Sequence, residues 1–282
     1  MAHRFSRRLA AVAMGAIAMA LPLGANGQLA LDRRNSDKPI EIYASQGIEW
    51  GRDQRVAIAR GDARAVQGDV SVRGDTLTVH YRPSATGSNE IWRVEAQGQV
   101  RITSPEQTAT GSYGVYEIER GLLVLTGSPR IKTKTDDVTA RDQIEYWENQ
   151  NAAVARGNAQ VASGPRRIKA DTLTAFFKGG QGNTREVERV EAHGNVLVAT
   201  ANEIVRGDRG VYQTESGIAV LLGSVKMTRG GSQLNGAYAE VNLKTGVSRL
   251  MAAAPDRGGD GRVRGLIVPG ENGPARGNGT RR

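Results

Sequence analysis

The chain repeats itself with an offset of 96 residues, because residues 44–131 align without a gap with residues 140–227. Ala-Arg-Gly-Asp-Ala at 59–63 matches Ala-Arg-Gly-Asn-Ala at 155–159, and Asp-Thr-Leu-Thr at 75–78 recurs one period later. A fixed period is typical of repeat architectures, in which stacked units share one continuous core. Such regularity leaves little room for a unique catalytic site.

Two shorter motifs alternate within the repeat. The first begins with a polar or small residue followed by alternating apolar residues, and it starts at Gln46, Asp75, Ser112, Asp142, Asp171, Asp208 and about Ala237. The second is a glycine inside an alternating apolar run, at Gly61, Gly98, Gly127, Gly157, Gly194 and Gly223. The two motifs are separated by 15 residues in most units and by 23 in two units. The eight additional residues, near 82–89 and 178–185, predict longer hairpin loops.

Both motifs have the periodicity of β-strands. At 94–102 the even positions are apolar or glycine, and the odd positions are Glu, Gln or Arg. Side chains two residues apart in a strand point to the same face, so each strand has one apolar and one polar face. No stretch after residue 40 keeps the spacing of an amphipathic helix. The sequence therefore predicts an all-β fold of repeated antiparallel two-strand units, whose apolar face is either a plain core or one that also receives a ligand.

The recurrent glycines need a structural reason, because glycine inside a strand is entropically costly and buries no side chain. One interpretation is a bulge that bends the strand. The other is space for a bulky apolar guest. The sequence favours the first and leaves the second open.

The ends of the chain differ from the repeats. Residues 1–27 combine a basic start, a short apolar core and small residues before a predicted cut at Gln28, which is typical of a cleaved signal peptide and predicts a periplasmic location; an uncleaved membrane anchor is the alternative. We expect the repeat domain to span 28–254 and a Gly/Arg-rich disordered tail to span 255–282. The apolar run at 263–268 either has no role or is a strand that docks on an exposed sheet edge.

Composition excludes several classes of function. The chain has no cysteine, so disulfides and thiolate sites are absent. The recurring aspartates are spaced evenly at strand starts, which indicates turn or edge hydrogen bonding rather than paired catalytic acids. We predict no catalytic residue, no metal site, no cofactor and no enzymatic activity. The net charge of +9 comes largely from the two ends, and with 5% aromatic residues no nucleic-acid binding is predicted.

These motifs resemble a known family. Ala-Asp-Thr-Leu-Thr with a following aromatic, at 170–177, and Ala-x-Gly-Asn-Val at 192–196 are similar to the repeated units of the OstA-like (LptA) family. The resemblance covers about residues 38–250. It implies an open twisted β-jellyroll whose apolar interior holds the acyl chains of lipopolysaccharide. It also implies end-to-end self-association into a bridge between an inner-membrane transport complex and an outer-membrane translocon.

Together with the strand alternation, the resemblance gives candidate site residues. The expected lipid-binding side chains are apolar or aromatic residues of the interior face: Leu77, Val79, Val100, Tyr116, Leu173, Phe177, Val196 and Tyr212. The expected oligomer edges lie at the first and last strands of the repeat body, at Ile40, Ile42, Val241 and Leu243.

Two other classes of function stay open. One is a related envelope protein of the same fold, either a membrane-anchored jellyroll that hands lipid on, a structural scaffold, or a detached amino-terminal domain of the translocon. The other is a repeat-built polysaccharide lyase or hydrolase. The enzyme would need clustered acids or a calcium site, and the evenly spread aspartates do not favour it.

Overall fold

The computed structural model describes residues 40–83, 89–178, 186–245, 247–253 and 262–268. The expected signal peptide at 1–27 lies outside these residues, as do 84–88 and 179–185 within the expected hairpin loops.

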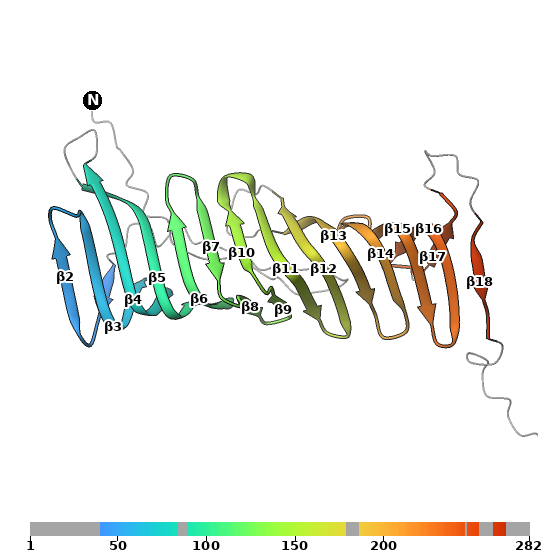
Figure 1. The fold of residues 1–282 in the computed structure, drawn as a ribbon, viewed down its shortest axis with the longest axis horizontal. Coiled ribbons are helices and arrows are strands. Elements are labelled where there is room, and N and C mark those ends of the chain that lie inside the picture. The colour runs from blue at the N-terminus through green and yellow to red at the C-terminus, as the bar shows by residue number, and fades with distance from the viewer. Residues whose placement is uncertain (1–39, 84–88, 179–185, 246, 254–261, 269–282) are drawn as a thin grey trace, which may run out of the picture.

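The described residues form one antiparallel sheet that runs the length of the molecule (Figure 1). Consecutive strands are hydrogen-bonded neighbours almost throughout, as the two-strand repeat predicts. The strands are β1 (Glu41–Tyr43), β2 (Gly47–Gly51), β3 (Val56–Gln67), β4 (Val70–Pro83), β5 (Asn89–Thr103), β6 (Gln107–Glu117), β7 (Leu122–Thr126), β8 (Arg130–Thr133), β9 (Asp136–Thr139), β10 (Gln143–Trp147), β11 (Ala152–Ser163), β12 (Arg166–Phe177), β13 (Val187–Ala199), β14 (Ile204–Gln213), β15 (Ile218–Arg229), β16 (Ser232–Asn242), β17 (Val247–Met251) and β18 (Arg264–Leu266). A short 3₁₀ turn, η2 (Glu148–Gln150), joins β10 to β11.

The long strands are divided in two by an irregularity near their middle. In β5, for example, the register with β6 shifts between Gln97 and Val100. The short strands are halves of the same kind: β1 and β2 both pair with β3, and β17 and β18 both pair with β16. The strand halves make two leaves that share one apolar core. We call the leaf that contains β2, β7, β10 and β17 the first leaf, and the leaf that contains β1, β8, β9 and β18 the second leaf.

The repeated glycines mark this division. Gly98 has φ +73°, and Gln99 after it is also left-handed at 45°; the same pair recurs at Gly157 and Asn158 with φ of 82° and 47°. A Cβ on Gly98 would lie 1.9 Å from Oδ2 of Asp75, the residue that starts the first motif. At all six glycines this space is filled by the polar residue of the first motif or its neighbour. The predicted bulge is therefore confirmed, and the idea that these glycines make room for an apolar guest is wrong.

The core lies between the leaves, and a well-packed part of it lies near the middle of the sheet. The largest fully buried side chains include Leu125, Ile131, Val138, Ile144 and Tyr146, from β7, β8, β9 and β10. These are the strands at which the first copy of the sequence repeat meets the second. The all-β fold predicted from the sequence is confirmed, and the folded-over sheet is an open β-jellyroll.

The carboxyl-terminal edge differs from the prediction. Val241 is not on an edge strand, because it pairs with Ala219 of β15 on one side and with Ser248 of β17 on the other. Leu243 follows β16 and lines the interior. The edge is instead formed by β17 and by β18, which comes from the apolar run at 263–268 within the expected tail.

The expected loop at 82–89 is also partly strand, because Arg82 pairs with Glu90 and Pro83 with Asn89. The additional residues of this unit therefore lengthen β4 and β5 as well as the connection between them.

Candidate functional site

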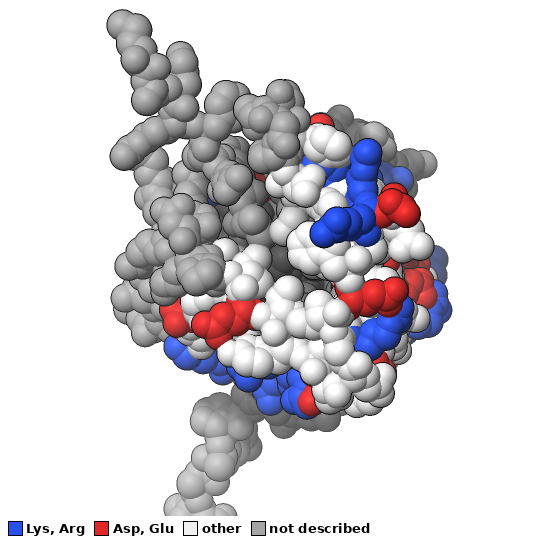
Figure 2. Space-filling model, turned by 90° about the vertical axis from the view of Figure 1, so that its left-hand side faces the viewer, with Lys and Arg blue, Asp and Glu red and all other residues white. Residues whose placement is uncertain are grey.

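An apolar groove opens between the leaves at the β1 end of the sheet. It has a volume of about 790 Å³, part of it open to solvent. Its lining is apolar except for Gln67 and the Tyr116 hydroxyl, and comes from both leaves: Ile40, Ile42, Ile48, Ala57, Ala59, Ala65, Val66, Gln67, Val70, Val72, Leu77, Val79, Val94, Tyr116 and Ile118. Figure 2 looks onto this end and shows a hollow between uncharged residues, with most of the charged side chains around the outside.

Three of the expected lipid-binding residues line this groove. Leu77 and Val79 project from β4 into the groove, and Tyr116 closes part of it from β6. The Tyr116 hydroxyl donates a hydrogen bond of 3.1 Å to Oε2 of Glu148 in the η2 turn. Burial raises the pKa of Tyr116 far above its ordinary value, so the phenol stays neutral and presents its ring to the groove.

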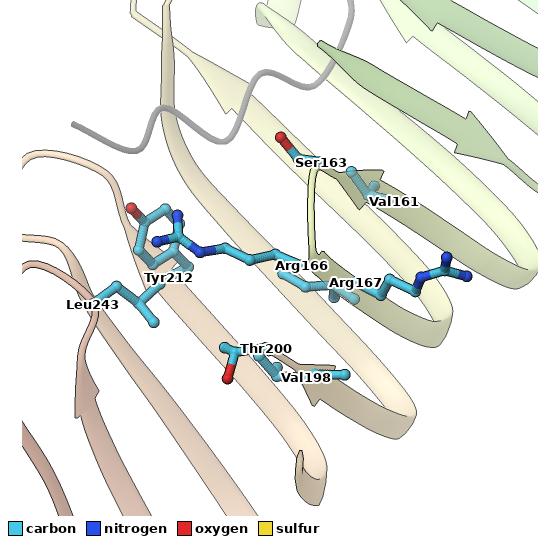
Figure 3. Close-up of a pocket in the computed structure, with 10 residues that line it drawn as sticks. Val161, Ser163, Arg166, Arg167, Val198, Thr200, Tyr212 and Leu243 are labelled. Atoms are coloured by element: carbon cyan, nitrogen blue, oxygen red, sulfur yellow. The ribbon is translucent and has the colours of Figure 1, made fainter. Parts of the chain in front are cut away.

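A second groove of about 420 Å³ lies toward the other end (Figure 3). Tyr212, Val161 and Val198 supply its apolar lining, and Arg166 reaches across it toward Tyr212 while Arg167 points the other way. A neighbouring pocket of about 280 Å³ shares Val198, Thr200 and Leu243 with it. Tyr212 is thus the fourth expected lipid-binding residue that lines open space.

The other four expected residues face the same interior but lie in its packed part. Val100, Leu173, Phe177 and Val196 belong to the buried core and are at most 4% exposed. Phe177 packs edge-on against Tyr146 with ring centroids 6.2 Å apart. These residues line none of the grooves described above, although they lie on β5, β12 and β13, the same strands that contribute lining residues to the grooves.

Sequence reasoning missed several lining residues. Ile48, Val70, Val94 and Ile118 follow the same alternation as the predicted lipid-binding residues, and this alternation is the signal that could have identified them. Ile40 and Ile42, expected only at an oligomer edge, also line the groove at that edge.

The outer face carries charged networks rather than a reactive centre. Glu95 accepts a hydrogen bond of 2.7 Å from Tyr113, and its Oε1 lies 2.8 Å from Nε of Arg93 and 3.0 Å from Nε2 of His80. Burial alone would raise the pKa of Glu95, but the hydrogen bond from Tyr113 and the charge of Arg93 hold it below its ordinary value. In the described part of the chain, no group of three or more His, Cys, Asp or Glu side chains is arranged to hold a metal ion.

Most of the large apolar side chains that are exposed lie at the two ends of the sheet. Trp50 is 64% exposed, Ile48 54% and Leu266 65%. Of the exposed large hydrophobic residues among those described, only Ile204 lies away from the two ends: Ile40, Ile42, Tyr43, Ile48, Trp50, Ile204, Val247, Val263, Leu266, Ile267 and Val268. Exposed apolar surface gathered in this way is typical of an interaction site.

Known proteins with similarity to this chain include one sequence relative and one solved structure. In the described residues, no helix is long and apolar enough to cross a membrane. An uncharacterised protein of Rhizobium meliloti strain 1021 is 25% identical over 178 residues, which cover 60% of this chain and 95% of that protein. The crystal structure of LptH from Pseudomonas aeruginosa, the LptA homologous periplasmic component of the lipopolysaccharide transport device, covers 83% of this chain and 99% of its own at 13% identity. Its TM-score of 0.23 is too low to support an argument.

The family comparison is decisive. The model of the LptA/(LptD N-terminal domain) LPS transport protein family matches twice, at residues 44–151 and 140–247, with the same offset of 96 residues as the internal repeat. Together the two matches span well over half of the chain. The repeat, the folded-over sheet and the apolar interior are therefore features of a transport protein rather than an enzyme, and the chain belongs to the LptA/(LptD N-terminal domain) lipopolysaccharide transport family.

Proposed function

We propose that the protein is a periplasmic lipopolysaccharide carrier that shields acyl chains between the two leaves of its sheet during transport from the inner to the outer membrane. The observation that supports this best is the groove of about 790 Å³ at the β1 end, whose lining is almost wholly apolar. A compartment of this kind suits a hydrocarbon chain and offers no group for chemistry on it.

The energetics favour such a role. Each CH₂ group that leaves water contributes about 0.8 kcal/mol. Several acyl chains crossing an aqueous compartment therefore need continuous cover. The groove reaches the β1 edge, where Ile40 and Ile42 line it, so the apolar path extends to the edge of the described sheet.

We further propose that molecules associate end to end through their edge strands, with each other and with the jellyrolls of the inner-membrane transport complex and the outer-membrane translocon. Both terminal edges expose apolar side chains, and an unpaired strand edge can template another strand. A contact of this type does not close on itself, so it gives an open bridge rather than a symmetric dimer.

Site-specific photo-crosslinking in cells tests the lipid site. A photoreactive residue at Val79 or Tyr212, which line the two grooves, should capture lipopolysaccharide. The matched controls are Thr78 and Arg101, which alternate with interior residues on β4 and β5 and face outward. Equal capture by both sets would mean that the interior is only a structural core.

A cell-fractionation experiment tests the location. Amino-terminal sequencing of the mature protein should find Gln28 first, in the periplasmic fraction. A chain that starts at Met1 and stays with the membranes would instead support the membrane-anchored alternative.

A further inference from the structure

The edge strands at the two ends of the sheet match in length and direction. At one end the first leaf closes with the five residues of β2 and the second leaf with the three residues of β1. At the other end the first leaf closes with the five residues of β17 and the second leaf with the three of β18. The chain passes from the second leaf to the first in β1 and β2, and from the first to the second in β17 and β18. Two copies placed end to end therefore continue the antiparallel order in both leaves.

The alternation of side chains selects one register for such a contact. When β2 and β17 are paired over their full lengths, Gly47 faces Met251 and Glu49 faces Arg249. Ile48, which lines the groove, then faces Leu250, which packs against the core. Both apolar residues lie on the interior side and both charged residues lie outside. A shift by one residue would set apolar side chains against polar ones along the whole strand.

The charges of the two ends are complementary. The only charged residue in β1 is Glu41, and the only one in β2 is Glu49. The only charged residue in β17 is Arg249, and the only one in β18 is Arg264. When the strands are paired over their full lengths, Glu49 faces Arg249 directly, whereas Glu41 faces Leu266 and Arg264 faces Tyr43. Opposite charges facing each other across strands stabilise a pair, whereas like charges destabilise it, so the direct contribution comes from Glu49 and Arg249.

The second repeat illustrates what a neighbouring strand does at the Glu49 position. Glu145 lies 96 residues after Glu49, in β10, whose free side is covered by β7. It is 5% exposed, and it accepts hydrogen bonds of 2.6 Å from Arg156 and 2.8 Å from Trp147. The side chain of Glu49 is 66% exposed and lies 3.6 Å from Arg60, the equivalent of Arg156. The Glu49 position is therefore one that becomes buried when a strand lies beside it, as β7 lies beside β10 at Glu145.

We propose that β17 and β18 of one copy receive β2 and β1 of a second copy in this register, with Glu49 facing Arg249 and β18 completing the second leaf of the interface. The proposal rests on the end-to-end association proposed above, and it assigns a role to the apolar run of the tail. Strands that protect an edge from association tend to carry charges or proline. Apart from Arg264, the β18 run exposes apolar side chains, with Val263, Leu266, Ile267 and Val268 at 42%, 65%, 74% and 41%, which suits a strand that is covered by a partner.

Charge reversal in the full-length mature protein tests the register. In sedimentation velocity over a concentration series, Glu49→Arg and Arg249→Glu should each weaken self-association by about tenfold or more, because each creates a like-charge pair. The double variant restores an opposite pair at the same place and should return the association constant toward the wild-type value. Single variants that associate like the wild type, or a double variant that is no better than the singles, would overturn the register.

Matched controls carry the same charge changes away from both ends. Glu188→Arg on β13 and Arg206→Glu on β14 alter exposed residues of the sheet's outer face and should leave association unchanged. Circular dichroism of every variant checks that the sheet is intact. A wild-type protein that stays monomeric at all concentrations would overturn the proposal and leave a different jellyroll as the partner.

A pair of substitutions at Leu266 tests the part played by β18. The residue is 65% exposed, so neither change disturbs the core. Leu266→Asp places a negative charge near Glu41 of the second copy and should weaken association, whereas Leu266→Lys should not. No change in either variant, or tighter association in both, would remove β18 from the interface. If Leu266→Asp and Leu266→Lys weakened association equally, Leu266 would not face Glu41 of the second copy.

The lipid readout separates this proposal from the proposed function. A photoreactive residue at Val79 should still capture lipopolysaccharide in the Glu49→Arg and Arg249→Glu variants, because Val79 lies inside a single copy. Lost association with retained capture supports both proposals. Absent capture in the wild type would contradict the carrier function without bearing on the register.

Discussion

Equivalent residues of the two sequence repeats lie in opposite surroundings. Ile48 and Trp50 of β2 are 54% and 64% exposed, whereas Ile144 and Tyr146, 96 residues later in β10, are 1% and 2% exposed. The difference comes from the neighbour: β10 is covered by β7, while β2 has no strand beyond it among the described residues. The β2 edge is therefore apolar because it has the sequence pattern of a buried strand but no neighbouring strand to cover it.

The same comparison explains where the interior is open. Near the junction of the repeats, Leu125, Ile131 and Val138 fill the space between the leaves. At the β1 end the equivalent space is a groove of about 790 Å³. One pattern of sequence thus makes a packed middle that holds the leaves together and an open end that can receive a ligand.

Truncating the two aromatic residues should separate the regions most clearly. Tyr146→Ala removes a buried ring and should lower the free energy of unfolding by about 3–5 kcal/mol. Trp50→Ala removes an exposed ring whose contact is with Tyr81, at 5.4 Å between centroids, and should cost about 0.5–1.5 kcal/mol. Urea unfolding of the monomer measures both. Equal losses would mean that the β2 edge is as well packed as the middle.

The bulge glycines should give a smaller difference. Gly157 has φ +82°, and a Cβ there would lie 2.2 Å from Oδ2 of Asp142, so Gly157→Ala should cost about 1–3 kcal/mol. Gly61→Ala at the edge should cost less, because the Cβ would meet side-chain atoms of Gln46 and Ser45 no closer than 2.5 Å. Asp142 is exposed too, but two hydrogen bonds from Arg141 hold its carboxylate in place. Thermal unfolding compares the two variants. In a Gly157→Ala/Asp142→Ala double variant part of the loss should be recovered, and no recovery would assign the whole cost to the backbone angle.

The smallest expected effect concerns Glu148, a carboxylate in the packed middle whose equivalent at the edge is Arg52. Burial raises the pKa of Glu148 above its ordinary 4.5, against a hydrogen bond from Tyr116 that lowers it. The folded state therefore binds the proton more tightly than the unfolded state, and this group adds stability as the pH falls through its folded pKa and loses it above. Glu148→Gln should abolish this rise on acidification and slightly raise the unfolding midpoint at neutral pH. A wild-type and variant difference that is constant with pH would contradict the assignment.

The sequence predicted the strands and the bulges because both depend on local periodicity. It did not predict that Asp75 fills the space beside Gly98, because residues 23 apart meet only once the strands are paired and bent. It placed the last edge too early, at Val241 and Leu243, because the pattern does not show how far the sheet continues. The alternative that the apolar run at 263–268 is a docking strand is confirmed, since β18 pairs with β16. Groove and packed core could not be distinguished, because Ile48 and Ile144 follow one pattern and differ only in what lies beside them.

Filling the groove from within is the most direct test of the carrier function. Val79→Trp introduces a large ring into the groove, whereas Thr78→Trp adds the same ring on the outer face of the same strand. The measurement is the amount of lipopolysaccharide per protein that co-purifies from the periplasm, by mass spectrometry. We predict that the Val79→Trp protein carries at most about a tenth of the lipopolysaccharide that the wild type carries. The Thr78→Trp protein should carry the wild-type amount. A folded Val79→Trp protein that carries the wild-type amount would contradict the proposal that acyl chains lie between the leaves.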